Sequence, residues 1–324
     1  MGRLQAHMAI LVANILFSLN YSYSKSLIPG FLAPETLCMV RIGCAAVVFA
    51  LVGVTMVRER IRWRDLGWLA LAALFGTGGN QYIFLQGLQY TSPVDAAIIS
   101  VTGPVLVLVI SAILGRDRIT WFKSIGIAVG ASGALLTILY GGIANFGSGH
   151  LTGNILVFLA ALSYASYLVV VKNLMMRYHP ITVTAWMFGL STLAMLPFLG
   201  GSVFTTEWGR LTAGAWGSLA FVVLGATVTA YLLVAGSLKR LKPTTVSIYM
   251  YLQPVIASVA AILRGQDKAD WVKALAALLV FAGVFLVTQS YRFEEGRSKA
   301  VSRSGSDGVG LAEGSSGQPS KDCE

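Results

Sequence analysis

Apolar stretches long enough to cross a lipid bilayer follow one another along most of the chain. A transmembrane helix needs about 20 mostly apolar residues, because the hydrocarbon core is about 30 Å thick and each residue advances a helix by about 1.5 Å. The sequence therefore predicts an all-α membrane protein with ten transmembrane helices. The predicted spans are residues 6–27, 33–57, 66–87, 92–114, 121–140, 151–174, 181–200, 213–238, 243–263 and 271–290.

The composition supports this prediction and excludes several classes of protein. Of the 324 residues 56% are hydrophobic and only 12% are charged, against about 25% charged in an ordinary soluble protein. These values exclude a disordered chain, a soluble enzyme of ordinary composition and a disulfide scaffold. The three cysteines and three histidines form no metal-binding pattern, so we expect neither a metal nor a cofactor.

Lysine and arginine are distributed unevenly between the two sides of the predicted topology. If the N-terminus lies inside, the inside segments hold 18 of the 24 Lys and Arg residues and the outside segments hold five. Cytoplasmic loops of membrane proteins carry such an excess of positive charge. Both termini are therefore predicted to be cytoplasmic. The net charge of +10 is then explained without a nucleic-acid partner.

The second half of the chain repeats part of the first half at a constant shift of 150 residues. The shift aligns span 92–114 with span 243–263 and span 121–140 with span 271–290. The matched pairs are Pro93 and Pro243, Pro104 and Pro254, Gly115 and Gly265, Asp117 and Asp267, Trp121 and Trp271, Lys123 and Lys273, Gly133 and Gly283, and Leu136 and Leu286. Residues 1–140 and 151–291 are therefore predicted to be two repeats, followed by a disordered cytoplasmic tail at 292–324 that is rich in Ser, Gly and charge.

Each predicted repeat contains five spans, which is an odd number. If both ends of the chain lie inside, the two halves must be inserted upside down relative to each other. Inverted repeats are typical of transporters, because two similar halves can exchange conformations and expose one central site to each side in turn. The alternative is an old duplication that serves packing alone.

The repeated motif P-x10-G-x-D-x3-W resembles the EamA-type branch of the drug/metabolite transporter superfamily. It occurs from Pro104 to Trp121 and again from Pro254 to Trp271. The family often has Gly-Glu where this chain has Gly115-Arg116-Asp117 and Gly265-Gln266-Asp267, and an acidic residue where it has Gln253. The resemblance implies a central cavity enclosed by both halves, with spans 121–140 and 271–290 outside it. It also implies export of amino acids, metabolites or drugs across the bacterial inner membrane.

Prolines inside two matched spans indicate where a binding site lies. Pro104 and Pro254 free backbone carbonyls, and interrupted helices at corresponding positions of two halves mark transporter sites. Polar side chains at helical spacing mark other inward faces, because amide and phenol groups are costly in lipid. These side chains either bind substrate or bond helix to helix. The cavity candidates are Asn14, Ser18, Tyr21, Tyr82, Gln86, Ser163, Tyr167, Thr227, Tyr231, Tyr251 and Gln253, with Pro104 and Pro254.

Two charged residues inside spans are candidates for substrate binding or ion coupling. Arg41 lies about two turns into span 33–57, where it either holds a substrate carboxylate, extends to the interface or makes a structural bond. Asp95 lies one turn into span 92–114, where it either protonates during transport or serves as part of a helix N-cap with Ser92.

The sequence favours a secondary carrier for a small polar or amphipathic molecule. It has no G-x-x-x-x-G-K-[ST] loop for ATP and none of the residue pairs expected of a membrane enzyme. An exchanger of phosphorylated or nucleotide-linked sugars needs several deep basic residues, and Arg41 is the one candidate. A sensor or assembly subunit without transport is a further alternative. Gly126 and Gly130 form a GxxxG pattern, which favours packing within the chain, with a homodimer as the alternative.

Overall fold

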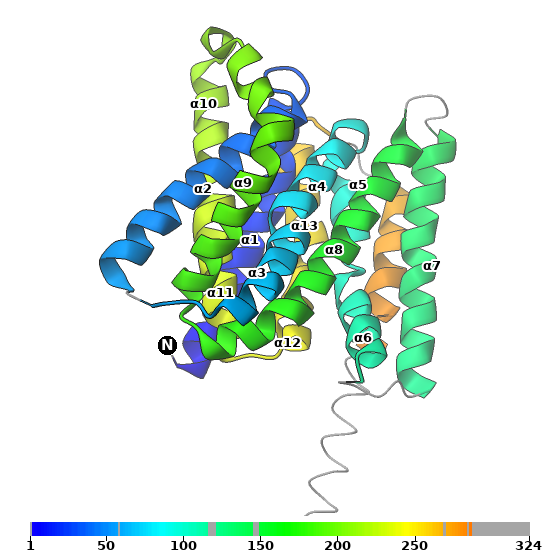
Figure 1. The fold of residues 1–324 in the computed structure, drawn as a ribbon. Coiled ribbons are helices and arrows are strands. Elements are labelled where there is room, and N and C mark those ends of the chain that lie inside the picture. The colour runs from blue at the N-terminus through cyan, green and yellow to red at the C-terminus, as the bar shows by residue number, and fades with distance from the viewer. Residues whose placement is uncertain are drawn as a thin grey trace, which may run out of the picture.

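The computed structural model describes residues 2–57, 59–115, 121–144, 149–267, 270–283 and 285–286, and its regular elements in these ranges are all helical (Figure 1). Asp117 and the predicted tail at 292–324 lie outside the described residues. The helices are α1 (Arg3–Leu27), α2 (Pro34–Met56), α3 (Trp63–Gly76), α4 (Gly78–Tyr90), α5 (Pro93–Ser100), α6 (Gly103–Ile113), α7 (Trp121–Ala144), α8 (His150–Arg177), α9 (Pro180–Thr205), α10 (Ala213–Ala220), α11 (Ala230–Leu238), α12 (Pro243–Ile248) and α13 (Leu252–Leu263). Short 3-10 turns cover Trp208–Arg210 (η1) and Tyr249–Tyr251 (η3), a π-helix covers Phe221–Thr229 (η2), and a further apolar helix covers Trp271–Gly283.

Seven helical segments in the described ranges are long and apolar enough, by length and composition, to cross a membrane. They carry large apolar side chains on their outward faces, for example Leu193, Phe198 and Phe204 of α9. Such side chains suit contact with lipid tails. The predicted all-helical membrane protein is confirmed at this level, whereas the full set of ten spans stays a prediction.

The predicted span 66–87 is divided by a break at Thr77. Thr77 has φ −126° and ψ −75°, outside the helical region, and it separates α3 from α4. Its hydroxyl bonds to Ala73 O and to Ser191 of α9, while Ser191 Oγ also accepts from Gly78 N at 3.1 Å. The neighbouring Gly76 lies so close to the Tyr167 ring that a Cβ would be 2.3 Å from it. Contacts with α8 and α9 therefore stabilise the break between α3 and α4.

Two other helices break just before the matched prolines, as predicted from the sequence. The α5 helix ends at Ser100 and α6 begins at Gly103, while η3 separates α12 from α13. The two breaks touch, since a Cβ on Gly103 would lie 2.8 Å from Met250 Cε. The π-helix η2 is a fourth irregularity, and the sequence analysis did not predict it.

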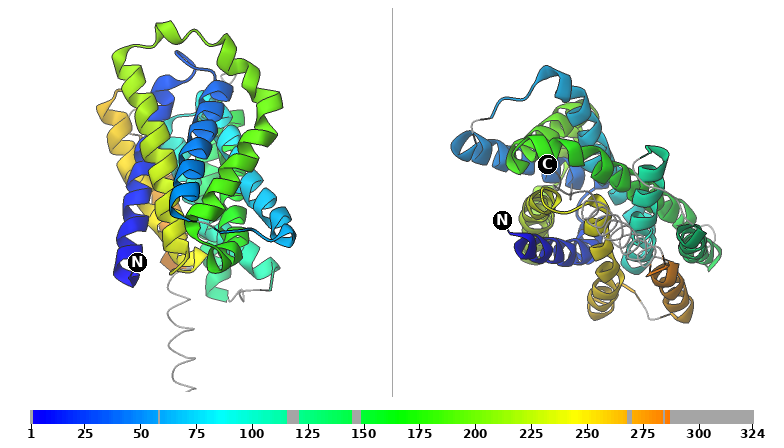
Figure 2. Two further views of the ribbon diagram at one scale, coloured as in Figure 1. Left: turned by 60° about the vertical axis from the view of Figure 1, so that its left-hand side comes forward. Right: turned by 90° about the horizontal axis from the view of Figure 1, so that it is seen from below.

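The helices form a bundle in which α1 contacts α4, α5, η2, α11 and α13. In the same bundle α2 packs on α9, and α4 packs on α8. The α7 helix and Trp271–Gly283 lie side by side at one edge of the bundle (Figures 1 and 2). The α-carbon of Gly283 lies against the backbone of Gly130 and Gly126. The GxxxG face of α7 is thus covered within the chain, as the packing interpretation predicted.

Candidate substrate cavity

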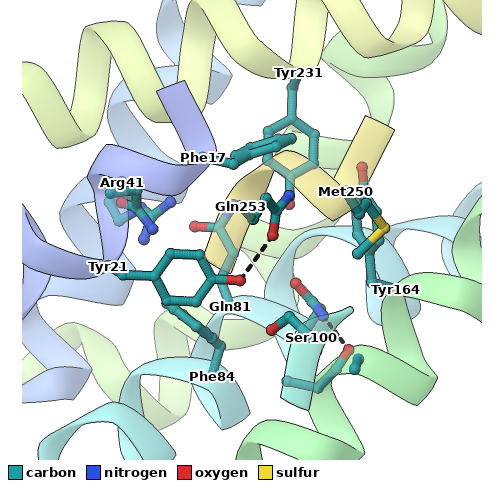
Figure 3. Close-up of a pocket in the computed structure, with 14 residues that line it drawn as sticks. Phe17, Tyr21, Arg41, Gln81, Phe84, Ser100, Tyr164, Tyr231, Met250 and Gln253 are labelled. Carbon is teal, nitrogen blue, oxygen red and sulfur yellow. Dashed lines mark hydrogen bonds between the residues drawn. The ribbon is translucent and has the colours of Figure 1, made fainter. Parts of the chain in front are cut away.

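An internal cavity of about 90 Å³ lies between helices of both halves of the chain (Figure 3). Its walls come from α1, α2, α4, α5, α8, α11, α13 and the turn η3. The side chains combine aromatic rings, three of them tyrosines, with amides, one serine hydroxyl and one guanidinium. The lining residues are Phe17, Asn20, Tyr21, Arg41, Asn80, Gln81, Phe84, Ser100, Ala160, Ala161, Tyr164, Tyr231, Met250 and Gln253.

A hydrogen-bonded chain joins α1 to α13 along one wall. Tyr21 Oη donates to Gln253 Oε1 at 3.0 Å, as the dashed line in Figure 3 shows. Gln253 Nε2 donates to Asn14 Oδ1 at 2.8 Å, and Asn14 Nδ2 donates to Ile10 O at 2.9 Å. Gln253 can present its amide here because η3 breaks the helix immediately before α13. The break thus positions a polar group at the cavity.

Arg41 of α2 is the charged residue of this wall, and it is only 3% exposed. Its Nε donates to Thr227 Oγ1 at 2.9 Å, and the Thr227 hydroxyl donates in turn to Val222 O at 2.8 Å. That second bond spans five residues, as the π-helix requires, so η2 turns Thr227 toward Arg41. Placing an arginine at mid-membrane depth costs about 2.5–3.5 kcal/mol. Arg41 does not extend to the interface, and its contacts in the described chain leave Nη1 without a hydrogen-bond partner.

Aromatic rings also line the cavity. The Phe17 and Tyr231 rings meet edge to face at 5.8 Å, and the Tyr21 and Phe84 rings do so at 5.4 Å. Tyr231 Oη donates to Gly76 O at 2.6 Å. Because α3 ends at Gly76, the break at Thr77 supplies the carbonyl that orients Tyr231. Ring faces and bonded hydroxyls together suit a molecule with an apolar body and a polar group.

Four of the sequence candidates border the cavity, namely Tyr21, Arg41, Tyr231 and Gln253. A second group lies directly behind its wall and holds the lining residues in place. Asn14 bonds Gln253, Ser18 donates to Asn14 O, Tyr167 packs against Tyr231, and Thr227 bonds Arg41.

The remaining candidates lie elsewhere, because they contact other neighbours in the bundle. Tyr82 packs in the apolar core, Gln86 Nε2 bonds Glu35 Oε1, and Ser163 Oγ donates to Phe75 O at 2.9 Å. Tyr251 packs edge to face on Phe281, and neither Pro104 nor Pro254 borders the cavity. The prolines mark the breaks, whereas Ser100 and Met250 just before them line the space.

The sequence analysis missed Phe17, Asn20, Asn80, Gln81, Phe84, Ser100, Ala160, Ala161, Tyr164 and Met250 as cavity residues. One signal was present for Asn80 and Gln81. They directly follow the glycine-rich run 76–79 that surrounds the break. A glycine-rich run can interrupt a helix as an intrahelical proline does, and interrupted helices mark transporter sites. Polar residues next to such a run are therefore site candidates.

Asp95 does not border the cavity and lies in the first turn of α5. Its backbone N–H donates to Ser92 Oγ at 3.1 Å, so the predicted N-cap at Ser92 is confirmed. The carboxylate lies 3.5 Å from Lys273 Nζ and 3.9 Å from His150 Nε2, and Lys273 also pairs with Asp267 at 2.9 Å. No group of three or more His, Cys, Asp or Glu side chains in the described ranges could hold a metal ion.

Two lysines bond to the carbonyls of helix ends in the same manner. At the upper end Lys25 Nζ of α1 donates to the carbonyls of Leu88, Gln89 and Thr91 at 2.8–3.0 Å, where α4 ends. At the lower end Lys172 Nζ of α8 donates to Leu238 O and Leu241 O at 2.5 and 2.9 Å, where α11 ends. Each ammonium group therefore satisfies helix carbonyls that would otherwise lack donors. We call these contacts the upper and lower lysine ties.

Comparison with known proteins places the chain in a family. The model of the EamA-like transporter family matches residues 4–139 and again residues 151–289. The chain belongs to the EamA-like transporter family. This is a family of membrane transporters within the drug/metabolite transporter superfamily, so the resemblance seen in the sequence is confirmed.

Relatives of this EamA-like protein are named as transporters. An uncharacterized transporter, YyaM of Bacillus subtilis, is 23% identical over 309 residues, covering 93% of this chain and 99% of the relative. An uncharacterized transporter of Archaeoglobus fulgidus is 26% identical over 259 residues, covering 80% and 90%. A probable terminal-alkyne amino-acid exporter of Streptantibioticus cattleyicolor is 27% identical over 255 residues, covering 78% and 83%.

The fold is shared with a protein of known crystal structure. The two superpose with a TM-score of 0.64 at 17% sequence identity, covering 89% of this chain and 98% of the other. At this level of identity the likeness concerns the fold alone. The fold is therefore one already observed in a crystal structure. The family match and the apolar helices make the EamA-like protein an integral membrane protein.

Proposed function

We propose that this protein is a secondary transporter that moves a small polar or amphipathic metabolite, an amino acid or related compound, across the bacterial inner membrane by alternating access. Export is the proposed direction, and both termini are cytoplasmic. The carrying observation is the cavity with aromatic and polar walls drawn from both halves of the chain. The relative that is named an amino-acid exporter supports this substrate class.

The proposal includes two inverted repeats of five helices, 1–140 and 151–291, and matched contacts in the two halves support it. With the shift of 150 residues Thr77 corresponds to Thr227, while α2 and α9 both begin at a proline, Pro34 and Pro180, and correspond with a shift of 146 residues. Arg41 of α2 bonds Thr227, and Ser191 of α9 bonds Thr77, so corresponding helices contact the two threonines with the halves exchanged, from positions one turn apart. The break at Thr77 and the π-helix around Thr227 are then corresponding irregularities.

The cavity and its closures follow the same correspondence. Lining pairs at equivalent positions are Gln81 with Tyr231, Ser100 with Met250 and, with a shift of 147 residues in the first helix of each half, Phe17 with Tyr164. The lysine ties form another such pair, since Lys25 and Lys172 also differ by 147 residues. In alternating access, each half in turn opens one end of the bundle while the equivalent contact keeps the other end closed.

The structure offers no specific observation for the other candidate functions. Phosphorylated sugars carry more charge than the cavity matches, because Arg41 is the one cationic side chain among its described lining residues. The named relatives are transporters, which favours transport over an enzyme or an assembly subunit.

Filling the cavity is expected to abolish transport. Ala161 lines the cavity in α8, and Ala161→Trp would place an indole in a space of about 90 Å³. Purified protein in liposomes should show saturable exchange of labelled amino acids, and this variant should lose at least 90% of the rate. Ala194→Trp is the matched control, because Ala194 is exposed on α9. Unchanged exchange by a folded Ala161→Trp variant would contradict the proposed site.

A further inference from the structure

We infer that Arg41 binds a carboxylate group of the transported substrate, with Gln81 completing the polar contacts, so that the transported molecules are carboxylates with an apolar body. This inference rests on the proposed transport function and adds the chemistry of the ligand. Figure 3 shows Arg41, Gln81, Tyr21 and Gln253 around the same space.

The first observation is that the guanidinium is oriented but incompletely bonded. A guanidinium has five N–H donors in a planar fork that matches the two oxygens of a carboxylate. Thr227 accepts from Nε and so fixes the plane of the group. Nη1 is buried and has no hydrogen-bond partner in the part of the chain that the structure describes. The terminal edge of the fork is therefore the part left for a ligand.

The second observation is that the described part of the chain supplies no counterion. Its ion pairs join His150 or Lys273 to Asp95, Lys273 to Asp267, Arg177 to Asp65 and Arg210 to Glu207. None involves Arg41, and no acidic side chain lines the cavity among the described residues. A cavity with one buried cation and no anion attracts an anionic ligand and disfavours a purely cationic one.

The third observation is that the helix contact made by Arg41 does not require a charge. Ser191 of α9, the helix that corresponds to α2 in the other half, joins its helix to Thr77 with a neutral hydroxyl. A residue needed only to bond α2 to η2 could therefore be neutral as well. The charge of Arg41 is more than this helix contact needs, and Arg41 lines the cavity.

Gln81 provides a second group with free bonding capacity. Neither its amide oxygen nor its amide nitrogen has a hydrogen-bond partner within the described residues, and both atoms are buried. Gln81 lines the cavity from α4 while Arg41 lines it from α2. A carboxylate at Arg41 would leave the amide oxygen available for an N–H or O–H group on the same substrate. The rings of Phe17, Tyr21 and Tyr164 would contact the apolar body.

The test compares substrates that differ only in the carboxylate. Reconstituted protein is assayed by counterflow with a panel of labelled amino acids, each as free acid, as primary amide and as the carboxylic acid without the amino group. We expect both acids to be transported at least tenfold faster than the amide. Arg41→Met should remove this preference by lowering acid flux at least tenfold. Arg41→Lys keeps the charge without the fork, and it should raise the KM for the acid with little change in kcat.

The outcomes separate this inference from the proposed transport function. Saturable flux of amides at the same rate as acids, with Arg41→Met unchanged, would overturn carboxylate binding and leave a transporter. Absence of flux for every form, from protein with a cooperative thermal unfolding transition, would overturn both. If Arg41→Met does not fold, Arg41→Lys decides, because an unchanged KM for acids would overturn the inference. Lys239→Met is the control for the loss of one positive charge, because Lys239 is exposed and follows the C-terminus of α11.

Discussion

Gly283→Ala should destabilise the protein by about 1–3 kcal/mol, the range for forcing an extra methyl group into a packed site. A Cβ at this position would lie 2.2 Å from Gly130 N, 2.5 Å from Gly130 Cα and 2.6 Å from Gly126 O. All three atoms belong to backbone, so no side-chain rotation relieves the clash. The α7 helix and Trp271–Gly283 must move apart. Thermal or denaturant unfolding of the purified protein in detergent measures the loss.

Gly189→Ala is the matched control for this variant. Gly189 also lies inside a helix, α9, but a Cβ there would meet nothing within 4 Å. Alanine is about 1 kcal/mol better than glycine in a helix interior, so this substitution should be neutral or stabilising. Equal stability of the two variants would show that the helices at this edge do not approach as closely as described.

Lys25→Met and Lys172→Met should each reduce the transport rate at least tenfold. Methionine keeps most of the length of lysine but cannot donate to the carbonyls at the ends of α4 and α11. A buried polar group that loses its partner costs about 1–3 kcal/mol, and 1.4 kcal/mol is tenfold in an equilibrium. Each variant should therefore favour opening of its own end of the bundle. Counterflow in liposomes measures the rate.

Accessibility of the cavity distinguishes the two lysine variants from each other. A cysteine introduced at Ser100 on the cavity wall should react faster with a membrane-impermeant reagent from the upper side in Lys25→Met, and from the lower side in Lys172→Met. Lys239→Met, which removes an exposed ammonium group, should leave both rates within twofold of the parent. Transport at the parental rate by both tie variants would contradict their role in closing the bundle.

The sequence predicted the breaks at proline because proline has a direct chemical effect on a helix. It lacks an N–H and clashes with the preceding turn, so Pro104 and Pro254 indicated irregular backbone in two helices. The break at Thr77 follows from contacts with Ser191 and Tyr167, which are distant in sequence. The glycine-rich run 76–79 was its one local marker, whereas the π-helix around Thr227 has none, because its residues also suit an α-helix.

The same difference explains which cavity residues were predicted. Polar groups in apolar spans must turn inward, and this rule alone found Tyr21, Arg41, Tyr231 and Gln253. Extending a stripe by steps of four residues led to Gln86, which bonds Glu35. Such steps do not show which neighbouring helix a polar side chain will meet. Apolar lining residues such as Phe17 and Ala161 carry no polar signal, so their place depends on the packing of helices that are distant in sequence.

The π-helix η2 also contains one residue more than a regular α-helix would need over the same length. A π turn holds one residue more than an α turn, so the side chains before and after it differ in direction by about the 100° that one α-helical residue contributes. Deleting a single residue between 221 and 226 can be absorbed by conversion to a regular α-helix, which would turn Thr227 away from Arg41. A regular helix such as α8 contains no extra residue, so a deletion there rotates every later side chain. This segment can therefore tolerate natural length variation of one residue, but Arg41 would then lose the contact with Thr227 that orients it.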